Sequence, residues 1–383
     1  MIKPRIIVTG ATGKTGSVVV AELLKAGYPV RALVHREDGR SQRLRARGAE
    51  VAVADVGDVE RVTEALKDVQ RAYYCPPWDP NILLGAVSFA TAAKEAHLKH
   101  IVGLTQWLAS PSHPSLMTRQ LWLVDRLFSM TPGVGHTIVN PGFFADAYLS
   151  TLGMAAHLGL FPWAYGNSRN TPPSTEDIAR VAAAALMDPA LHAGKGYRPT
   201  GPKLLGAQEM AQTVGRVTGR PVRIVPTPTW LLIKTARLAG NPIELLSGMR
   251  YYIEDHKRGA FEHGAPTTDV LNVTGRPAED FEPIARRYAA LPNSQRNLHN
   301  WIREFGRFMW TPLSPASIRR AMSANCVNHR YRGRSSRPNR ISGAASTAST
   351  LLYKMTNWGY SQVYVSSSRG SLRTLWVCAR LIQ

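Results

Sequence analysis

Three glycines near the N-terminus have a spacing that suits phosphate binding. Gly10, Gly13 and Gly16 follow the apolar run 6–8 and precede an apolar, alanine-rich pattern over 17–26. Such glycines let a chain turn sharply, approach a phosphate with its backbone and pack a helix closely on a strand. Because a helix N-terminus offers free N–H groups, this pattern predicts a pyrophosphate site; the alternative is a tight turn without a ligand. The predicted contact residues are Thr9, Gly10, Thr12, Gly13, Lys14, Thr15 and Gly16.

The residues after the second predicted strand, 29–34, indicate which dinucleotide binds. An NAD site places an acid there to bind the ribose 2′-hydroxyl, whereas a 2′-phosphate prefers guanidinium groups. This chain has His35 and Arg36, with Arg31 inside the strand, so NADP(H) is favoured over NAD(H). Two alternatives stay open: Arg36 belongs to a solvated basic run, or Glu37 and Asp38 reach the ribose.

Other strand ends carry further candidates for binding and catalysis. After the third strand, 49–54, Asp55 and Val56 are expected beside the adenine, and Asp58 is expected to cap the helix 59–67. The fourth, fifth and sixth strands are predicted at 71–75, 100–105 and 136–139. Ligands bind at the carboxyl ends of such strands, where the candidates are Cys75, Pro76, Thr105, Gln106, Asn140 and Phe143. Phe143 is equally well explained as a core residue.

These segments together resemble the NmrA-like group of atypical short-chain dehydrogenases/reductases. The resemblance rests on residues 9–16, 30–34, 55–58 and 140–144, and it extends over about 3–310. It implies a nucleotide-binding Rossmann fold. Members include reductases of quinones or plant phenolics and regulators that bind the nucleotide without turnover. A quinone-like or aromatic acceptor and a protein partner are therefore both expectations for this chain.

One departure from ordinary short-chain dehydrogenases bears on the reaction. The chain has no Tyr-x-x-x-Lys sequence and no lysine between Lys99 and Lys195. The predicted helix 116–128 offers Arg119, Gln120 and Asp125 instead, and an arginine stays protonated. Thr105, Gln106 and Arg119 are thus weak catalytic candidates. Hydride transfer to an acceptor that needs no protein acid remains open, as does a nucleotide sensor without chemistry.

The second half of the chain predicts a smaller lobe. Residues 149–165 are expected to form an apolar lid, and Ser174 and Asp177 have the spacing of a reciprocal helix cap, before a helix that enters this lobe. His256 lies in a charged run, 256–263, that predicts a solvated loop.

The overall composition bounds the remaining possibilities. The chain has 383 residues, 44% of them apolar, and no apolar run long enough to span a membrane, so no membrane partner is expected. Its three cysteines form no metal or disulfide pattern, which fits a cytoplasmic protein. The net charge of +21 is uneven, since residues 311–383 contain 11 Lys and Arg but no acid.

The expected fold class is α/β. A doubly wound parallel sheet of Rossmann type occupies 1–140, a smaller α+β substrate or partner lobe occupies 141–310, and a basic tail occupies 311–383. Three interpretations of the tail stay open: a disordered segment, a nucleic-acid contact, or translation in a shifted reading frame.

Overall fold

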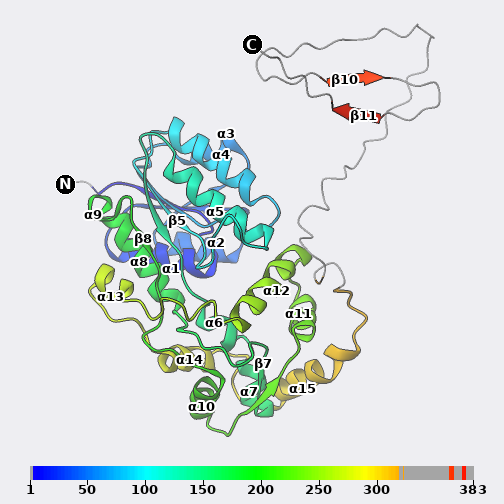
Figure 1. Ribbon diagram of the computed structural model, residues 1–383. Helices are drawn as coiled ribbons and strands as arrows, with labels where there is room; N and C mark the ends of the chain where they lie inside the picture. Colours follow the sequence, from blue (N-terminus) through cyan, green and yellow to red (C-terminus); the bar gives the residue numbers. More distant parts are fainter. Residues whose placement is uncertain (1–2, 319–321, 323–361, 366–372, 377–383) are drawn as a thin grey trace. The chain divides into compact units, whose positions relative to one another are not determined.

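The computed structural model describes residues 3–318, 322, 362–365 and 373–376 (Figure 1). Its central feature is a seven-stranded parallel sheet with the order β3-β2-β1-β4-β5-β6-β8. The strands are β1 (Ile6–Val8), β2 (Val30–Val34), β3 (Glu50–Val53), β4 (Arg71–Tyr74), β5 (His100–Leu104), β6 (Gly135–Val139) and β8 (Gly196–Tyr197). The order reverses between β1 and β4, which confirms the predicted doubly wound sheet.

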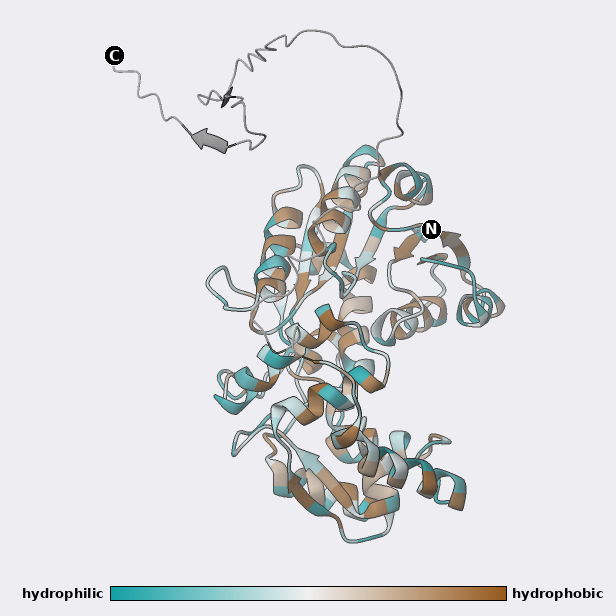
Figure 2. Cartoon of the chain, turned by 90° about the vertical axis from the view of Figure 1, so that its right-hand side faces the viewer, coloured by the Kyte–Doolittle hydropathy of each residue, from teal (hydrophilic) through white to brown (hydrophobic). Residues whose placement is uncertain are grey.

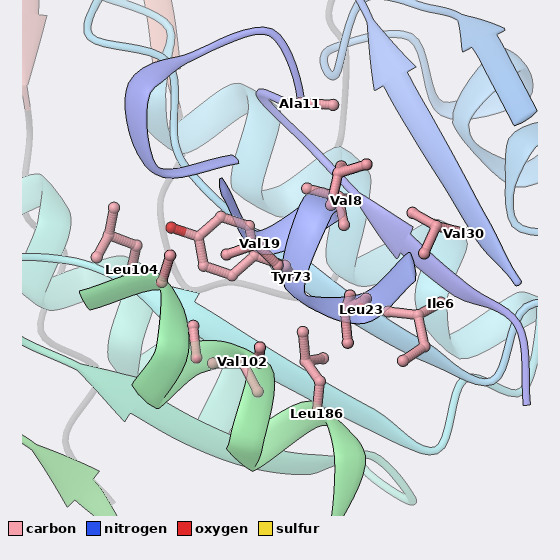
Figure 3. Close-up of a cluster of buried hydrophobic side chains, with 14 of the residues drawn as sticks. Ile6, Val8, Ala11, Val19, Leu23, Val30, Tyr73, Val102, Leu104 and Leu186 are labelled. Atoms are coloured by element: carbon pink, nitrogen blue, oxygen red, sulfur yellow. The ribbon is translucent and has the colours of Figure 1, made fainter. Parts of the chain in front are cut away.

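Helices cover both faces of this sheet. One face carries α1 (Lys14–Lys25), α2 (Gly39–Ala46) and α8 (Thr175–Met187), with α13 (Asp269–Thr274) packed on α8. The other face carries α3 (Val59–Ala65), α4 (Ile82–Glu95) and α5 (Leu116–Ser129). Figure 3 shows Val19 and Leu23 of α1 and Leu186 of α8 against strand residues such as Val102. Figure 2 shows mostly hydrophobic strands between helices of mixed hydropathy, as expected for a sheet buried on both faces.

Side-chain caps explain where three of these helices begin. Asp58, Ser115 and Ser174 accept N–H groups from the first turns of α3, α5 and α8. The predicted cap by Asp58 is therefore confirmed. The reciprocal contact predicted for Asp177 is wrong, because its carboxylate binds Arg180 and the Glu279 N–H instead.

The second lobe lies beyond the carboxyl end of the sheet (Figure 1). It contains α6 (Ala145–Leu149), α7 (Leu152–Leu158), α10 (Ala207–Thr218), α11 (Thr229–Leu238), α12 (Ile243–Lys257), α14 (Phe281–Ala289) and α15 (Leu298–Leu313). Its two strands, β7 (Leu160–Trp163) and β9 (Arg223–Pro226), pair in parallel. Phe161, Trp163 and Tyr165 are buried in the core of this lobe, so the lid expected over 149–165 is wrong.

The chain crosses between the two lobes more than once. Although α8, α9 (Pro189–His192) and β8 follow residue 140, β8 pairs with β6, and α8 packs on α1. The helix expected to enter the second lobe at Ser174 thus packs on the Rossmann sheet instead, and the strand β8 that follows it extends that sheet. The sheet therefore draws residues from both sides of the expected boundary at 140.

Residues 333–383 form a separate unit. Within it, β10 (Gln362–Val365) and β11 (Arg373–Trp376) pair antiparallel. The tail predicted over 311–383 otherwise falls largely outside the described residues. In the part of the chain that the structure describes, no helix has the length and hydrophobicity needed to cross a membrane.

Candidate functional site

The glycine turn has the geometry that a dinucleotide requires. Gly10 has φ +58°, in the left-handed region that favours glycine, and its carbonyl accepts the Gly13 N–H at 2.8 Å. A Cβ on Gly16 would lie 2.3 Å from the Gly10 oxygen, so a side chain there would clash with backbone. Helix α1 begins at Lys14, three residues before the predicted start, and no side chain caps it. Its first N–H groups and its dipole therefore suit a pyrophosphate.

Buried hydroxyls hold this turn against β4. Thr9 Oγ1 accepts the Cys75 N–H at 2.9 Å, and the Tyr73 hydroxyl donates to Thr15 Oγ1 at 3.1 Å. Burial raises the pKa of the Cys75 thiol to about 11, so it stays protonated at neutral pH. Thr9, Thr15 and Cys75 thus shape the turn, while Pro76 is buried beside them and Thr12 is partly exposed.

Lys14 connects the glycine turn to the second lobe. Its ammonium forms an ion pair with Asp146, near the start of α6. The Lys14 side chain is 72% exposed, whereas that of Asp146 is 8% exposed. The contact places a cation at the start of α1 and ties the two lobes together there.

Arg31, within β2, and Arg36, just after β2, differ in their exposure to solvent. Arg31 is buried, and its guanidinium donates to the carbonyls of Ala65 and Lys67 at 2.7 and 2.8 Å and pairs with Glu50. The expectation that Arg31 faces a 2′-phosphate is therefore wrong. Arg36 is exposed and makes no polar contact with a described residue.

The two acidic residues that follow Arg36 form polar contacts with neighbouring residues. Glu37 pairs with Arg45 at 2.6 Å. Asp38 caps α2 through the N–H groups of Arg40 and Ser41. The Arg40 guanidinium, which donates to the other carboxylate oxygen at 2.7 Å, together with these N–H groups lowers the pKa of Asp38 to about 2. Arg36 thus remains exposed and without a polar partner among the described residues, beside two acids that have partners of their own.

Of the two uses predicted for the loop after β3, the structure shows the helix cap. Asp55 accepts the Gly57 N–H at 2.8 Å and remains exposed, with His35 Nδ1 3.7 Å from its other oxygen. Asp58 caps α3 independently, and Val56 packs near Gly85. Asp55, Val56 and His35 are partly or fully exposed, so their side chains are accessible to a ligand. The adenine contact predicted for Asp55 and Val56 stays a prediction.

Thr105 and Asn140 meet at the ends of β5 and β6. Thr105 donates a 3.1 Å hydrogen bond to Asp125 on α5, and the Asn140 amide donates to Thr105 Oγ1. Burial raises the pKa of Asp125 to about 7, although these bonds oppose the change. Thr105 is 8% exposed, so this cluster positions strand ends rather than presenting a free hydroxyl.

Two further candidates flank this cluster. Gln106 is buried, and neither its amide nitrogen nor its amide oxygen has a partner among the described residues. Arg119 lies one turn into α5, and its side chain makes no polar contact in the described part of the chain. Neither geometry identifies a catalytic role.

A row of aromatic rings lies beside the ends of β4 and β6. The rings of Trp78 and Tyr252 are 6.0 Å apart, and those of Tyr252 and Phe143 are 6.1 Å apart. Phe261 continues the row, stacked on Tyr252 at 5.9 Å. Trp78 is 40% exposed, and Tyr252 and Phe143 are half-buried, so the row keeps accessible apolar surface. Sequence reasoning found Phe143 but missed Trp78 and Tyr252, because 174 residues separate these two.

The loop between β5 and α5 is fixed to the second lobe by polar contacts. His113 Nε2 lies 3.1 Å from the Asp255 carboxylate of α12, and His113 Nδ1 accepts the Ser115 N–H. Arg198 lies over the Trp107 ring at 3.4 Å and donates to its carbonyl. The His113–Asp255 contact connects this loop to α12, the helix that carries Tyr252, whereas Arg198 follows β8 and fixes the loop within the Rossmann half.

His256 contradicts the solvated loop expected around it. The ring is fully buried, with Tyr148 on Nε2 and Ser168 on Nδ1. Burial lowers its pKa to about 4. It faces Tyr165 and Phe143 in the core of the second lobe and is therefore structural.

Comparison with known proteins shows which family this chain belongs to. The model of the NmrA-like family matches residues 2–104. The NAD(P)H azoreductase of Xenophilus azovorans is 32% identical over 287 residues, which cover 74% of this chain and 98% of that protein. Quinone oxidoreductase 2 of Escherichia coli is 27% identical over 227 residues, or 57% of this chain and 76% of that protein.

Solved structures show the same fold. An NADPH-dependent quinone oxidoreductase of Escherichia coli, complexed with NADPH, aligns with a TM-score of 0.63 at 23% identity, over 74% of this chain and 99% of that one. Triphenylmethane reductase of Citrobacter sp. aligns at 0.65 and 21% identity, over 75% and 100%. The chain therefore belongs to the NmrA-like family of Rossmann-fold proteins.

Proposed function

We propose that this protein is an NAD(P)H-dependent reductase that delivers hydride to a quinone-like or aromatic acceptor. The observation that carries the proposal is the aromatic row Trp78–Tyr252–Phe143 beside the strand ends that follow the glycine turn. Flat acceptors stack favourably on such rings. The relatives named as azo, quinone and dye reductases support the same class of acceptor.

The glycine turn and the start of α1 would hold the pyrophosphate of the dinucleotide. The fit rests on the absence of space for a Cβ at Gly16 and on the uncapped N-terminus of α1. Arg36 would pair with a 2′-phosphate, because Glu37 and Asp38 are held by Arg45 and by α2. We therefore propose a preference for NADPH over NADH.

When bound, the dinucleotide supplies the hydride. The chain's own residues bind and orient the acceptor on the aromatic row and hold α12 over it. The described tyrosines have no lysine four residues later, and burial raises the pKa of Tyr252 far above its ordinary value. A quinone that accepts hydride becomes an anion, and we propose that water supplies its proton.

The experiment is anaerobic NADPH oxidation by the full chain with quinones, azo dyes, enones and aldehydes. We expect turnover with the flat aromatic acceptors. Tyr252→Leu should raise KM for the acceptor without changing the affinity for NADPH, because the ring lies on the acceptor side. Trp230→Leu, an exposed tryptophan on α11, is the matched control.

Two outcomes would count against the proposal. If no acceptor supports NADPH oxidation although NADPH binds tightly, the result would favour a nucleotide sensor. An unchanged KM in Tyr252→Leu would remove the aromatic row from the acceptor site.

A further inference from the structure

Helix α15 presents its apolar side to solvent. Nineteen large apolar side chains are exposed in the described part of the chain, and eight of them lie on this helix of 16 residues. Trp230 and Leu238 of the neighbouring α11 and Leu291 bring the local total to eleven. Large exposed apolar patches on soluble proteins mark interaction sites, so the gathering of eight such side chains on one helix points to a partner.

The spacing along α15 places most of these residues on one face. Residues three and four positions apart share a helix face. We define the α15 apolar face as Leu298, Trp301, Ile302, Phe305, Met309 and Leu313, whose exposed fractions range from 42% to 73%.

The side of α15 that faces the protein is polar. Asn300, Glu304 and Thr311 are the buried residues of this helix. Asn300 donates to the carbonyls of Pro292 and Gln295, and Glu304 pairs with Arg303 and Arg307. The Glu304 pairs lie within the helix, whereas Asn300 ties it to the preceding segment. Lys234 of α11 holds its C-terminal end through the Pro312 carbonyl at 2.9 Å. Its amphipathicity is inverted relative to a helix that packs on a core.

The charges around this face favour an anionic surface as its partner. Segments 229–243 and 291–318 contain one acid, the buried Glu304, but five Lys and Arg, of which Arg237, Arg296 and Arg307 are exposed. A helix with Trp, Phe and Leu on one side and basic residues beside them suits the interface of an anionic bilayer. Trp301 and Trp310 also suit this interface, because an indole ring has an apolar body and a polar N–H.

We propose that the α15 apolar face docks this protein onto an anionic lipid bilayer. The helix would lie in the plane of the interface, with its apolar face among the acyl chains and with the exposed Arg296, next to the N-cap Asn297, near lipid phosphates. Such docking needs no membrane-spanning helix, so it is compatible with the absence of one among the described residues.

The experiment is co-sedimentation of the full chain with vesicles of phosphatidylcholine, with or without phosphatidylserine. We expect sedimentation with the serine-containing vesicles. The double variant Trp301→Ser/Phe305→Ser should lower the partition coefficient by about tenfold or more, because two large apolar side chains no longer enter the bilayer. The control Met130→Ser/Leu191→Ser changes two residues that are 71% and 61% exposed elsewhere, and it should bind as the wild type does. Thermal unfolding and NADPH affinity of each variant would establish that the fold is intact.

Three results would overturn the proposal. The wild type does not sediment with either vesicle. The double variant sediments as well as the wild type, which would assign binding to the basic segment after residue 318. The wild type is a dimer that the double variant dissociates, without any vesicle binding, which would identify a second copy as the partner.

Discussion

The hydroxyl of Thr105, at the end of β5, donates a 3.1 Å hydrogen bond to the Asp125 carboxylate on α5. Asp125 is 4% exposed and has no cationic partner at hydrogen-bonding distance in the described structure, and burial raises its pKa to about 7. The folded state therefore binds a proton that the unfolded state releases near pH 4. Stability attributable to this group falls as pH rises from about 4 to 7.

We accordingly predict that Asp125→Asn stabilises the protein at pH 8, by up to about 4 kcal/mol, and changes it little at pH 4. Denaturant unfolding at both pH values would measure this difference. Asp68→Asn, at an exposed loop position, should leave the pH dependence as in the wild type. Equal stability of Asp125→Asn and wild type at pH 8 would contradict the prediction.

Local patterns predicted the elements of the Rossmann half well. The strand β2 and the cap at Asp58 depend on neighbouring residues, so their sequence contains the necessary information. Arg31 was assigned wrongly because its partners are the carbonyls at the end of α3, more than 30 residues away. Alternation within a strand does not reveal such a distant carbonyl.

The second lobe was predicted less well for the same reason. His256 has a charged sequence neighbourhood, but Tyr148, 108 residues earlier, bonds to its ring. The aromatic row likewise joins three separate segments. These contacts are set by how the helices of this lobe pack, and no periodicity within one segment reports that packing.

Arg36→Ala should reduce NADPH affinity by about tenfold to a hundredfold and leave NADH affinity unchanged, because only NADPH carries the 2′-phosphate. Isothermal titration with both nucleotides would measure this change. Arg43→Ala, at an exposed position on the nearby α2, is the control for a general loss of positive charge. Equal losses for NADPH and NADH in Arg36→Ala would overturn the assignment.

Gly16→Ala should destabilise the protein by about 1 to 3 kcal/mol and abolish dinucleotide binding, because its Cβ would lie 2.3 Å from the Gly10 oxygen. Gly306→Ala on α15 meets no atom within 4 Å and should stabilise the helix by up to about 1 kcal/mol. Thermal unfolding of both variants would show whether the first is destabilised and the second stabilised. A Gly16→Ala protein that binds NADPH normally would contradict the close packing of the turn.

Lys14 and Asp146 should show a coupling free energy of about 1 kcal/mol in a double-mutant cycle, because Lys14 is mostly exposed and the pair is partly screened. Unfolding of Lys14→Ala, Asp146→Ala and the double variant would measure it. Lys25→Ala, a basic residue at the other end of α1, replaces Lys14→Ala in the control cycle. Strict additivity in the Lys14 cycle would show that the ion pair does not connect the lobes energetically.

His256 should make the fold sensitive to acid. Burial lowers its pKa to about 4, whereas an unfolded histidine titrates near its ordinary value of 6.5. Between these values the unfolded state binds the additional proton, so the free energy of unfolding falls as pH decreases from about 6.5 to 4.

His256→Gln removes the titrating ring while its amide still offers a donor and an acceptor to Tyr148 and Ser168. We expect a shallower loss of stability between pH 7 and 5 than in the wild type, even if the variant is less stable at pH 7. His97→Asn, at an exposed position with φ +53° that asparagine tolerates, should retain the wild-type slope. An unchanged slope in His256→Gln would mean that its burial does not contribute to acid sensitivity. Among the described histidines, that would leave His100 and His136, whose pKa values burial lowers to about 4, and His192, whose pKa burial also lowers.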